Sequence, residues 1–104
     1  TYTPPDSLAE LVRVRDQTCR WPGCTVPAAD AEIDHIVPFS RHRPAALQTT
    51  AANLQTLCKA HHLAKHNDGW TVQRDSTTGI TTWTAPGGRQ HHVPPATINL
   101  TTNT

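Results

Sequence analysis

The stretch DHIVPFSRHRPAALQTTAANLQTLCKAHHLAKH, residues 34–66, holds five of the seven histidines of this 104-residue chain. With them it carries an acid, an amide and a thiol, and the residues of interest are Asp34, His35, Asn53, Cys58, His61, His62 and His66. Side chains of these types bind metal ions and move protons. Polar groups are costly to bury without partners, so packing alone does not account for such a concentration. We therefore expect this stretch to form the active centre.

A second cluster of metal-binding residue types combines this stretch with the segment CRWPGC, which runs from Cys19 to Cys24. Its Pro-Gly pair favours a turn that brings the two thiols together. Alone, such a pair also fits a disulfide or two reduced, buried thiols. Cys58 and His61, however, lie three residues apart in a segment of helical character, so they share one face. We predict that these four side chains bind a structural zinc ion as a Cys3His set.

The composition indicates one small domain that needs additional stabilisation, such as a bound metal ion. Only 36% of the residues are hydrophobic and 5% aromatic, and a chain of 104 residues buries a limited core. Three cysteines are an odd number, which disulfides would not use up, whereas zinc can complete its ligands with histidine. The formal net charge of +1 neither demands nor excludes a nucleic-acid partner.

The sequence predicts neither a membrane segment nor a secretion signal. No apolar run approaches the roughly 18 residues that span a bilayer, and no charged-then-apolar leader opens the chain. We therefore expect an intracellular, cytoplasmic protein. Methionine is absent even at position 1, so we also expect the chain to be a piece of a longer protein.

The local patterns predict short helices and strands. Apolar residues at helical spacing after Asp6 or Ser7, either of which can cap a helix, predict a helix ending near Gln17. The segment AEIDHIVPF (31–39) predicts a strand, which must bulge or end near Asp34 and His35 if both serve one site. Residues 40–52 have the composition of a loop, residues 54–58 of a second strand and residues 59–66 of a helix. The apolar residues behind these patterns are Leu8, Leu11, Val12, Val14, Ile33, Val37, Leu54 and Leu57.

After His66 the sequence becomes rich in threonine and predicts a β-hairpin around the turn at residues 76–79. The residues expected to pack it on the core are Trp70, Val72, Ile80 and Trp83. His91 and His92 stand between a Gly-Gly turn and a Pro-Pro pair, and we expect them to be exposed rather than metal ligands. We expect the polar tail after Pro95 to be loose, and we discount the glycosylation motif at Asn99.

The predicted helix after Cys58 presents two pairs of candidate ligands on different sides. An α-helix turns by about 100 degrees per residue. The mean side-chain direction of Cys58 and His61 around the helix axis therefore differs by roughly 90 degrees from that of His62 and His66. One helix can therefore hold zinc on one flank and present two imidazoles on another. His62 and His66 could also be plain exposed histidines, but the acid and histidine at residues 34 and 35 favour a second site.

The order of these residues resembles that of the HNH, or ββα-metal, endonucleases. Asp34 and His35 are followed by Asn53, then by His62 nine residues later and His66 four residues after that. The resemblance covers residues 19 to about 70.

Within that superfamily the chain is most similar to a subgroup whose zinc-stapled HNH domain follows a long helical domain of unknown function. That subgroup has a similar Cys-Arg-aromatic-Pro-Gly-Cys knuckle and a similar Gly-Trp after the last histidine, here Gly69 and Trp70. Arg41, Arg43 and Pro44 stand where its members usually have glycines, and His61 stands where many HNH domains have a fourth cysteine.

The resemblance implies an α+β fold, namely a small ββα-metal (HNH) fold with a structural zinc knuckle, an N-terminal helix and a C-terminal β-hairpin. Within one structural domain we expect a leader and helix over residues 1–18 and a zinc-stapled HNH nuclease core over residues 19–70. We expect the hairpin over residues 71–95 and a flexible tail over residues 96–104.

The resemblance also implies the role of each residue. His35 would be the general base that takes a proton from water, and Asn53 would fix the loop that carries it. Asp34 and His62, with His66 as a third ligand, would bind one divalent ion, which could be Mg2+, Mn2+, Ni2+ or Zn2+. The candidates for phosphate contacts are Arg20, Arg41, Arg43, Lys59 and Lys65, although each fits solvated surface as well.

These roles predict a metal-dependent endonuclease that hydrolyses phosphodiester bonds in DNA, by nicking or by double-strand cleavage. Two alternatives stay open: a zinc-stapled nucleic-acid-binding module without catalysis, and a nuclease acting on RNA. The acid and base at these spacings favour the enzyme, because a pure binding module has no need of them.

Overall fold

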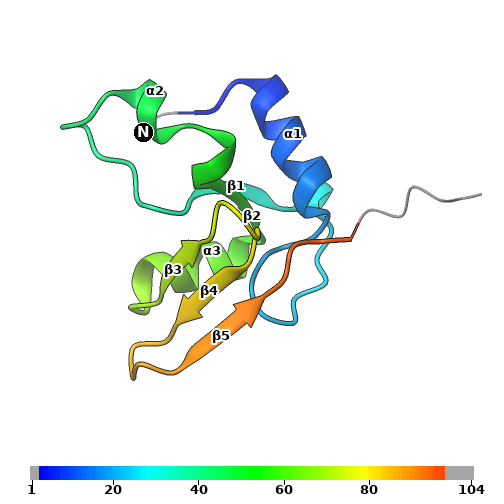
Figure 1. Ribbon diagram of the computed structural model, residues 1–104, viewed down its shortest axis with the longest axis vertical. Helices are drawn as coiled ribbons and strands as arrows, with labels where there is room; N and C mark the ends of the chain where they lie inside the picture. Colours follow the sequence, from blue (N-terminus) through cyan, green and yellow to red (C-terminus); the bar gives the residue numbers. More distant parts are fainter. Residues whose placement is uncertain (1–2, 98–104) are drawn as a thin grey trace, which may run out of the picture.

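The computed structural model describes residues 3–97 as helices and two antiparallel sheets, which confirms the predicted α+β class (Figure 1). The helices are α1 (Asp6–Asp16), α2 (Ala45–Gln48) and α3 (Lys59–Asn67), with short 3-10 turns η1 (Ala28–Asp30) and η2 (Ala51–Asn53). The strands are β1 (Glu32–His35), β2 (Leu54–Leu57), β3 (Thr71–Arg74), β4 (Thr81–Thr84) and β5 (Gln90–Val93). Strands β1 and β2 form one sheet, and β3, β4 and β5 form the other in that order.

The unit β1–β2–α3 carries the residues singled out above. Strand β1 pairs with β2 so that Asp34 lies opposite Gln55 and His35 opposite Leu54. The strand ends at His35. This ending was expected, because neighbouring residues of a regular strand face opposite sides and Asp34 and His35 were predicted to serve one site. All four residues of β2 are buried, because α1 and α3 both contact this strand.

The core joins this unit to the three-stranded sheet. Leu57 of β2 and Trp83 of β4 are fully buried, and Val72 of β3 packs with them. The indole of Trp83 donates a hydrogen bond of 2.9 Å from Nε1 to the carbonyl of Arg20, and Trp21 lies 5.0 Å from the Trp83 ring centre. The sheet is therefore fixed on the segment between Cys19 and Cys24.

The C-terminal part contains three strands where the sequence predicted a two-stranded hairpin. The expected turn is present between β3 and β4, but β4 also pairs with β5 on its other side. His91 on β5 is half-buried, 6.0 Å from the Trp70 ring centre, whereas His92 is exposed as expected. Strand β5 is short and polar, and hydrogen bonding to the free edge of β4 stabilises it without any apolar pattern of its own.

The expected loop over residues 40–52 contains α2 and η2 instead. The cause is Gln48, whose side chain is 2% exposed. Its Oε1 accepts a 2.7 Å hydrogen bond from the Ser40 N–H, and its Nε2 donates at 2.8 Å to the carbonyls of Ser40 and Arg43. The segment is therefore folded around one buried amide.

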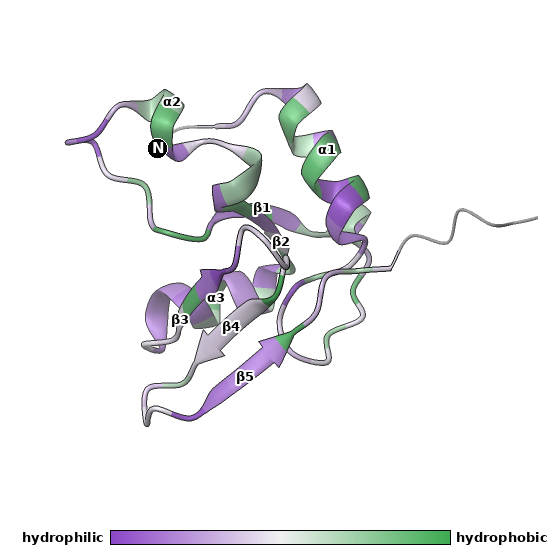
Figure 2. Ribbon diagram, viewed as in Figure 1, coloured by the Kyte–Doolittle hydropathy of each residue, from purple (hydrophilic) through white to green (hydrophobic). Residues whose placement is uncertain are grey.

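The apolar residues differ widely in burial, and among those expected to pack on the core Ile80 lies at the surface instead. In α1 only Val12 is fully buried, whereas Leu11 is 57% and Val14 54% exposed. Ile36 enters the core instead of Val37, which is 50% exposed, and Ile80 stays at the surface. Figure 2 accordingly shows hydrophobic residues in short patches, without a continuous hydrophobic face on α1 or α3.

The predicted caps of α1 are also wrong. The N-cap is Pro5, and neither Asp6 nor Ser7 makes a side-chain capping hydrogen bond, since both already lie inside the helix. Within the described residues no helix is long and apolar enough to cross a membrane. The motif at Asn99 and most of the expected flexible tail, like Thr1 and Tyr2, lie outside the described residues.

Candidate metal centres

The side chains of Cys19, Cys24, Cys58 and His61 converge as predicted. Their ligand atoms all lie within 4.8 Å of one another, and Nδ1 of His61 is 3.6 Å from Sγ of Cys19 and 3.3 Å from Sγ of Cys58. A tetrahedral zinc ion at about 2.0–2.3 Å from its ligands requires ligand spacings of roughly 3.5 Å. The donor set and its spacing therefore fit one zinc ion.

Apolar and aromatic side chains surround this cluster. The indole of Trp21 stacks on the His61 ring at 4.4 Å between ring centres with an angle of 3° between planes. Burial raises the pKa of the Cys19 thiol to about 12 in the metal-free protein and lowers that of the His61 imidazole. Burial also opposes ionisation of Cys58, but N–H groups of the first turn of α3 and neighbouring thiols bring its pKa below the ordinary value. A bound cation would displace the thiol protons and compensate the buried thiolates.

On another flank of α3, the side chains of Asp34, His62 and His66 form a second cluster. Their ligand atoms also lie within 4.8 Å of one another. Oδ1 of Asp34 is 3.2 Å from Nε2 of His62 and 3.6 Å from Nε2 of His66. One carboxylate oxygen and two imidazole nitrogens form a donor set that suits several divalent ions.

The second oxygen of Asp34 is already occupied. Oδ2 accepts hydrogen bonds of 2.9 Å from both Nζ of Lys65 and Nε2 of Gln55, and the carboxylate is almost fully buried. Lys65 Nζ also donates at 2.7 Å to the carbonyl of His35. Lys65 Nζ also donates to Oδ1 at 3.2 Å, so the carboxylate is held in one orientation, with Oδ1 close to the ammonium group as well as to the two imidazoles.

His62 is held from its other nitrogen. Nδ1 lies 2.7 Å from Oε1 of Glu32, which directs Nε2 towards Asp34. Carboxylates in this position fix the ring of a metal-binding histidine. Glu32 and Asp34 are two residues apart on β1 and share a face of the strand, so the period-2 pattern could have identified Glu32 from the sequence.

His35 lies in the same pocket as the second cluster. This pocket has a volume of about 550 Å³, and the side chains that line it include Asp34, His35, Arg41, His62 and His66. Nε2 of His35 is 3.0 Å from Oγ1 of Thr49, a contact that no sequence pattern indicated. Burial lowers the pKa of His35; Asp34 opposes this shift, whereas Lys65 adds to it. The net effect favours the neutral imidazole.

Asn53 fixes the chain that leaves β1. Its Oδ1 accepts a 2.9 Å hydrogen bond from the Val37 N–H, and its Nδ2 donates to the carbonyls of Val37 and Gln48 at 3.3 and 2.9 Å. Its own carbonyl accepts a 2.8 Å hydrogen bond from the Ile36 N–H. The amide therefore ties the segment after His35 to η2.

Comparison with known proteins identifies the family. Residues 17–68, half of the chain, match the family described as HNH endonuclease. This chain belongs to the HNH endonuclease family. The matched residues include both clusters, His35 and Asn53.

The curated relatives of this HNH domain come from Mycobacterium tuberculosis. "Uncharacterized protein Rv3776" from strain ATCC 25618 / H37Rv is 43% identical over 96 residues, which are 90% of this chain and 17% of the relative. "Uncharacterized protein MT2160" from strain CDC 1551 / Oshkosh is also 43% identical over 96 residues, 90% of this chain and 16% of the relative. The chain thus spans about a sixth of the length of these relatives. No solved structure matches it.

Two of the five cations expected to contact phosphates are buried in the HNH domain. Lys65 is engaged with Asp34, and Arg20 donates to the carbonyls of Asp16 and Pro94, each residue being 7% exposed. Their charged groups are engaged inside the domain and are not free to reach a nucleic-acid backbone. Arg43 and Lys59 are exposed, and Arg41 lines the pocket of His35.

Proposed function

We propose that this HNH domain is a metal-dependent endonuclease that hydrolyses phosphodiester bonds in DNA. The observation that carries the proposal is the common pocket of His35 and the cluster of Asp34, His62 and His66. A proton acceptor and a three-atom ligand set at one site are the two components that metal-assisted hydrolysis needs. Residues 19–70 would be the nuclease core, and in the whole protein a long helical domain would precede it.

His35 would take the proton of the attacking water. When Oγ1 of Thr49 accepts a hydrogen bond from Nε2–H of His35, Nδ1 is the nitrogen that remains free to accept a proton. The lowered pKa of His35 keeps the ring neutral at neutral pH, as a base must be. Asn53 would hold the segment after His35 in place through its backbone hydrogen bonds, and would take no part in proton transfer.

Asp34 Oδ1, His62 Nε2 and His66 Nε2 would hold a divalent ion, which supplies charge stabilisation for the scissile phosphate and the leaving oxygen. Glu32 and Lys65 would keep two of these ligands in their orientations. Arg41, at the edge of the pocket, and the exposed Arg43 and Lys59 are the proposed contacts to neighbouring phosphates. The zinc ion on Cys19, Cys24, Cys58 and His61 would have a structural role alone.

The test is incubation of the chain with supercoiled plasmid and Mg2+, Mn2+, Ni2+ or Zn2+. His35→Ala should reduce cutting by about 10²–10⁴-fold and leave divalent-ion binding intact, because it removes the base and no ligand. His62→Ala should weaken both. His92→Ala is the matched control, since His92 is an exposed histidine of β5 outside the pocket.

Three outcomes separate the proposal from its alternatives. Plasmid that is retarded but uncut with every ion would favour a binding module. Cutting of a structured RNA, with plasmid left intact, would favour a ribonuclease. Near-normal turnover of His35→Ala at neutral pH would contradict the assignment of the base.

A further inference from the structure

A second pocket adjoins the pocket of His35. It has a volume of about 340 Å³ and lies between the segment after β1, the end of α3 and strand β3. We call it the Trp70 pocket, after the tryptophan in its lining. Pro38 and His66 line both pockets. Because His66 is a proposed ligand of the divalent ion, a nucleotide next to a phosphate held at that ion would lie beside the Trp70 pocket.

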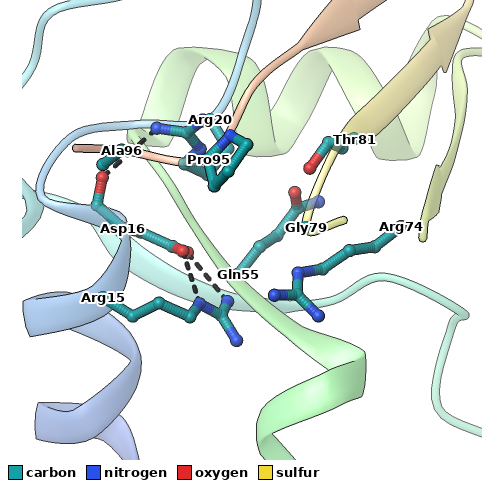
Figure 3. A pocket seen from close by; sticks show the side chains of 9 residues that line it. All are labelled: Arg15, Asp16, Arg20, Gln55, Arg74, Gly79, Thr81, Pro95 and Ala96. Atoms are coloured by element: carbon teal, nitrogen blue, oxygen red, sulfur yellow. Dashed lines mark hydrogen bonds and ion pairs between the residues drawn. The ribbon is translucent and has the colours of Figure 1, made fainter. Parts of the chain in front are cut away.

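The size of the Trp70 pocket suits a single nucleobase. Pockets for small molecules have volumes of roughly 300–1,000 Å³, and this one is near the lower end of that range. By contrast, the pocket lined by Arg15, Arg74 and Pro95 (Figure 3) has a volume of about 80 Å³ and no aromatic side chain in its lining. The Trp70 pocket is therefore the better candidate for a planar ring.

Apolar and aromatic side chains form much of the wall of the Trp70 pocket. Ile36 and Val72 belong to the buried core, and the half-exposed Val37 and the partly buried Trp70 extend this surface towards solvent. Trp21 packs against the indole of Trp70, with 4.6 Å between ring centres and an angle of 59° between planes. A ring that is held in place by its neighbours offers a preformed surface for a base.

The polar side chains of this wall add no negative charge. Among the described residues that line the Trp70 pocket there is no Asp or Glu, so no carboxylate of the lining repels a nucleic-acid strand. Lys65 lines it, but its ammonium group is bound to the carboxylate of Asp34. Thr71 and Gln73, both exposed on β3, offer a hydroxyl and an amide, which can donate and accept hydrogen bonds at the edge of a base.

We propose that the Trp70 pocket binds one unstacked nucleobase of the DNA, beside the phosphate that is cut. The HNH endonuclease family implies a nucleic-acid substrate, and the pocket adjoins the proposed active site, so a base is the planar group that arrives with the substrate. Bases present π-faces that stack on aromatic side chains with little dependence on sequence. The inference rests on the proposed endonuclease function and names the preferred substrate of that site.

The consequence is a preference for DNA with unpaired bases. A base in a continuous duplex is stacked and paired, and it reaches a side pocket only when it is extruded, which costs free energy. For a mismatched base or a base in a single strand this cost is lower. Negative supercoiling favours local unpairing, so supercoiled plasmid remains a substrate.

The first test measures binding without added divalent ions, so that it does not depend on cutting. A short oligothymidylate is compared with an abasic chain of the same length, which keeps the phosphates but lacks the bases. Oligothymidylate should bind at least about tenfold more tightly, because stacking is lost with the bases.

Spectra of the tryptophan indole N–H groups locate the bound base in the wild-type chain. Oligothymidylate should shift the 1H–15N signal of Trp70, and the abasic chain should not. The signal of Trp83 is the internal reference, since this indole is fully buried and donates to the carbonyl of Arg20. Equal affinities for the two chains, or a Trp70 signal that does not move, would overturn the proposal and leave the pocket to an apolar group of a partner protein.

Variants test the wall of the pocket. Trp70→Leu should bind the two chains with affinities that differ by less than about threefold, because the ring for stacking is gone. Val37→Asn is the second variant, at a half-exposed position whose change spares the core, and it should reduce the preference for oligothymidylate by about threefold. Val14→Asn is the matched control, since Val14 is equally half-exposed but lies on α1, outside the lining. A wild-type preference in both Val37→Asn and folded Trp70→Leu, or an equal loss in Val14→Asn, would place the base elsewhere.

The second test measures cutting with Mg2+, Mn2+, Ni2+ or Zn2+ on three substrates of one sequence. These are a continuous duplex, the same duplex with one central mismatch, and one strand alone. The mismatched duplex and the single strand should be cut at least about tenfold faster than the continuous duplex. Equal rates on all three would overturn the base pocket and leave the endonuclease function standing. No cutting of any substrate would contradict the endonuclease function instead, and the binding test would still decide whether the Trp70 pocket takes a base.

Discussion

The two metal clusters share α3 but have opposite environments. On one flank, Cys19 and Cys58 are 2% and 7% exposed, and Trp21 stacks on His61 and lies 5.0 Å from Trp83 of the three-stranded sheet. On the other flank, the side chain of His66 is 51% exposed, and the ligands line an open pocket. Packing holds the side chains of the first cluster in place, whereas hydrogen bonds and ion pairs to polar neighbours orient individual side chains of the second.

That difference explains which residues surround each cluster. Around the cluster of Cys19, Cys24, Cys58 and His61, the stacked ring of Trp21 restricts the imidazole. Around the second cluster, Glu32 fixes His62, and Lys65 and Gln55 fix Asp34. A site open to substrate cannot be enclosed by apolar side chains, so charged and hydrogen-bonded neighbours keep its ligands in place.

The largest effect is expected from Cys58→Ser, which removes a ligand from the packed cluster. The variant should lose zinc and unfold, because structural zinc sites supply on the order of 10 kcal/mol, as much as the whole stability of a small domain. Zinc content by elemental analysis and the thermal transition provide the measurement. A folded Cys58→Ser protein that keeps one zinc ion per chain would refute the ligand assignment.

The next effect concerns Lys65→Met, which breaks the buried pair with Asp34. Stability should fall by about 3–5 kcal/mol, because the carboxylate loses its cation. Divalent-ion affinity should rise at least about tenfold, because a positive charge beside the ligand carboxylate is removed. Denaturant unfolding and calorimetry with Mn2+ measure the two quantities.

The control for Lys65→Met is Lys59→Met, at the exposed start of the same helix. It should change neither quantity appreciably. If stability and ion affinity fell together in Lys65→Met, the orienting of Asp34 by Lys65 would outweigh the repulsion between its charge and the ion, and the predicted rise in affinity would be wrong.

A smaller effect is expected from Glu32→Gln, which keeps the shape of the partner of His62 but not its charge. Divalent-ion affinity should fall by about tenfold, towards the lower end of the effects of such outer partners, while zinc content stays unchanged. Asp30→Asn, an exposed carboxylate of η1, is the control. Equal affinities for the two variants would mean that His62 is oriented without Glu32.

The smallest effect is a displacement of the pH profile. Because burial lowers the pKa of His35, the neutral base persists to lower pH than in a free imidazole, whose ordinary value is 6.5. Plasmid turnover should therefore rise with pH, level off, and have its midpoint below 6.5. The midpoint should agree within about half a unit for Mg2+, Mn2+ and Ni2+, since the titrating group is the imidazole. A midpoint that follows the acidity of the ion's bound water would assign the proton transfer to that water instead.

The sequence predicted which candidate ligands lie together better than it predicted the neighbouring residues that orient them. The flanks of Cys58, His61, His62 and His66 were predictable from helical spacing, because an angle of about 100 degrees per residue assigns each to one side of the helix. Strand β2 and helix α3 were likewise predictable from local patterns. These features depend on residues close together in the chain.

The features that the sequence did not predict depend on long-range contacts. Thr49 meets His35 only because Gln48 folds residues 40–48 back on themselves. Lys65 has the sequence pattern of an exposed helical lysine, but its ammonium group is buried by the carboxylate of β1. Strand β5 exists because β4 offers a free edge. Local sequence patterns do not predict these contacts, because each depends on a residue or strand far away in the chain and not on local structural propensity.

The use of one short helix for both clusters makes the segment from Cys58 to His66 intolerant of any change in length. A residue inserted between His61 and His62 would leave the cysteines and His61 of the first cluster in place and rotate the two following histidines by about 100 degrees, away from Asp34. A deletion at that point would rotate them in the opposite direction. The segment between Ser40 and Pro44, by contrast, carries no ligand of either cluster and could lengthen without moving one. Homologous chains should therefore vary in length between the first histidine and the asparagine, and keep a constant spacing from the last cysteine to the last histidine.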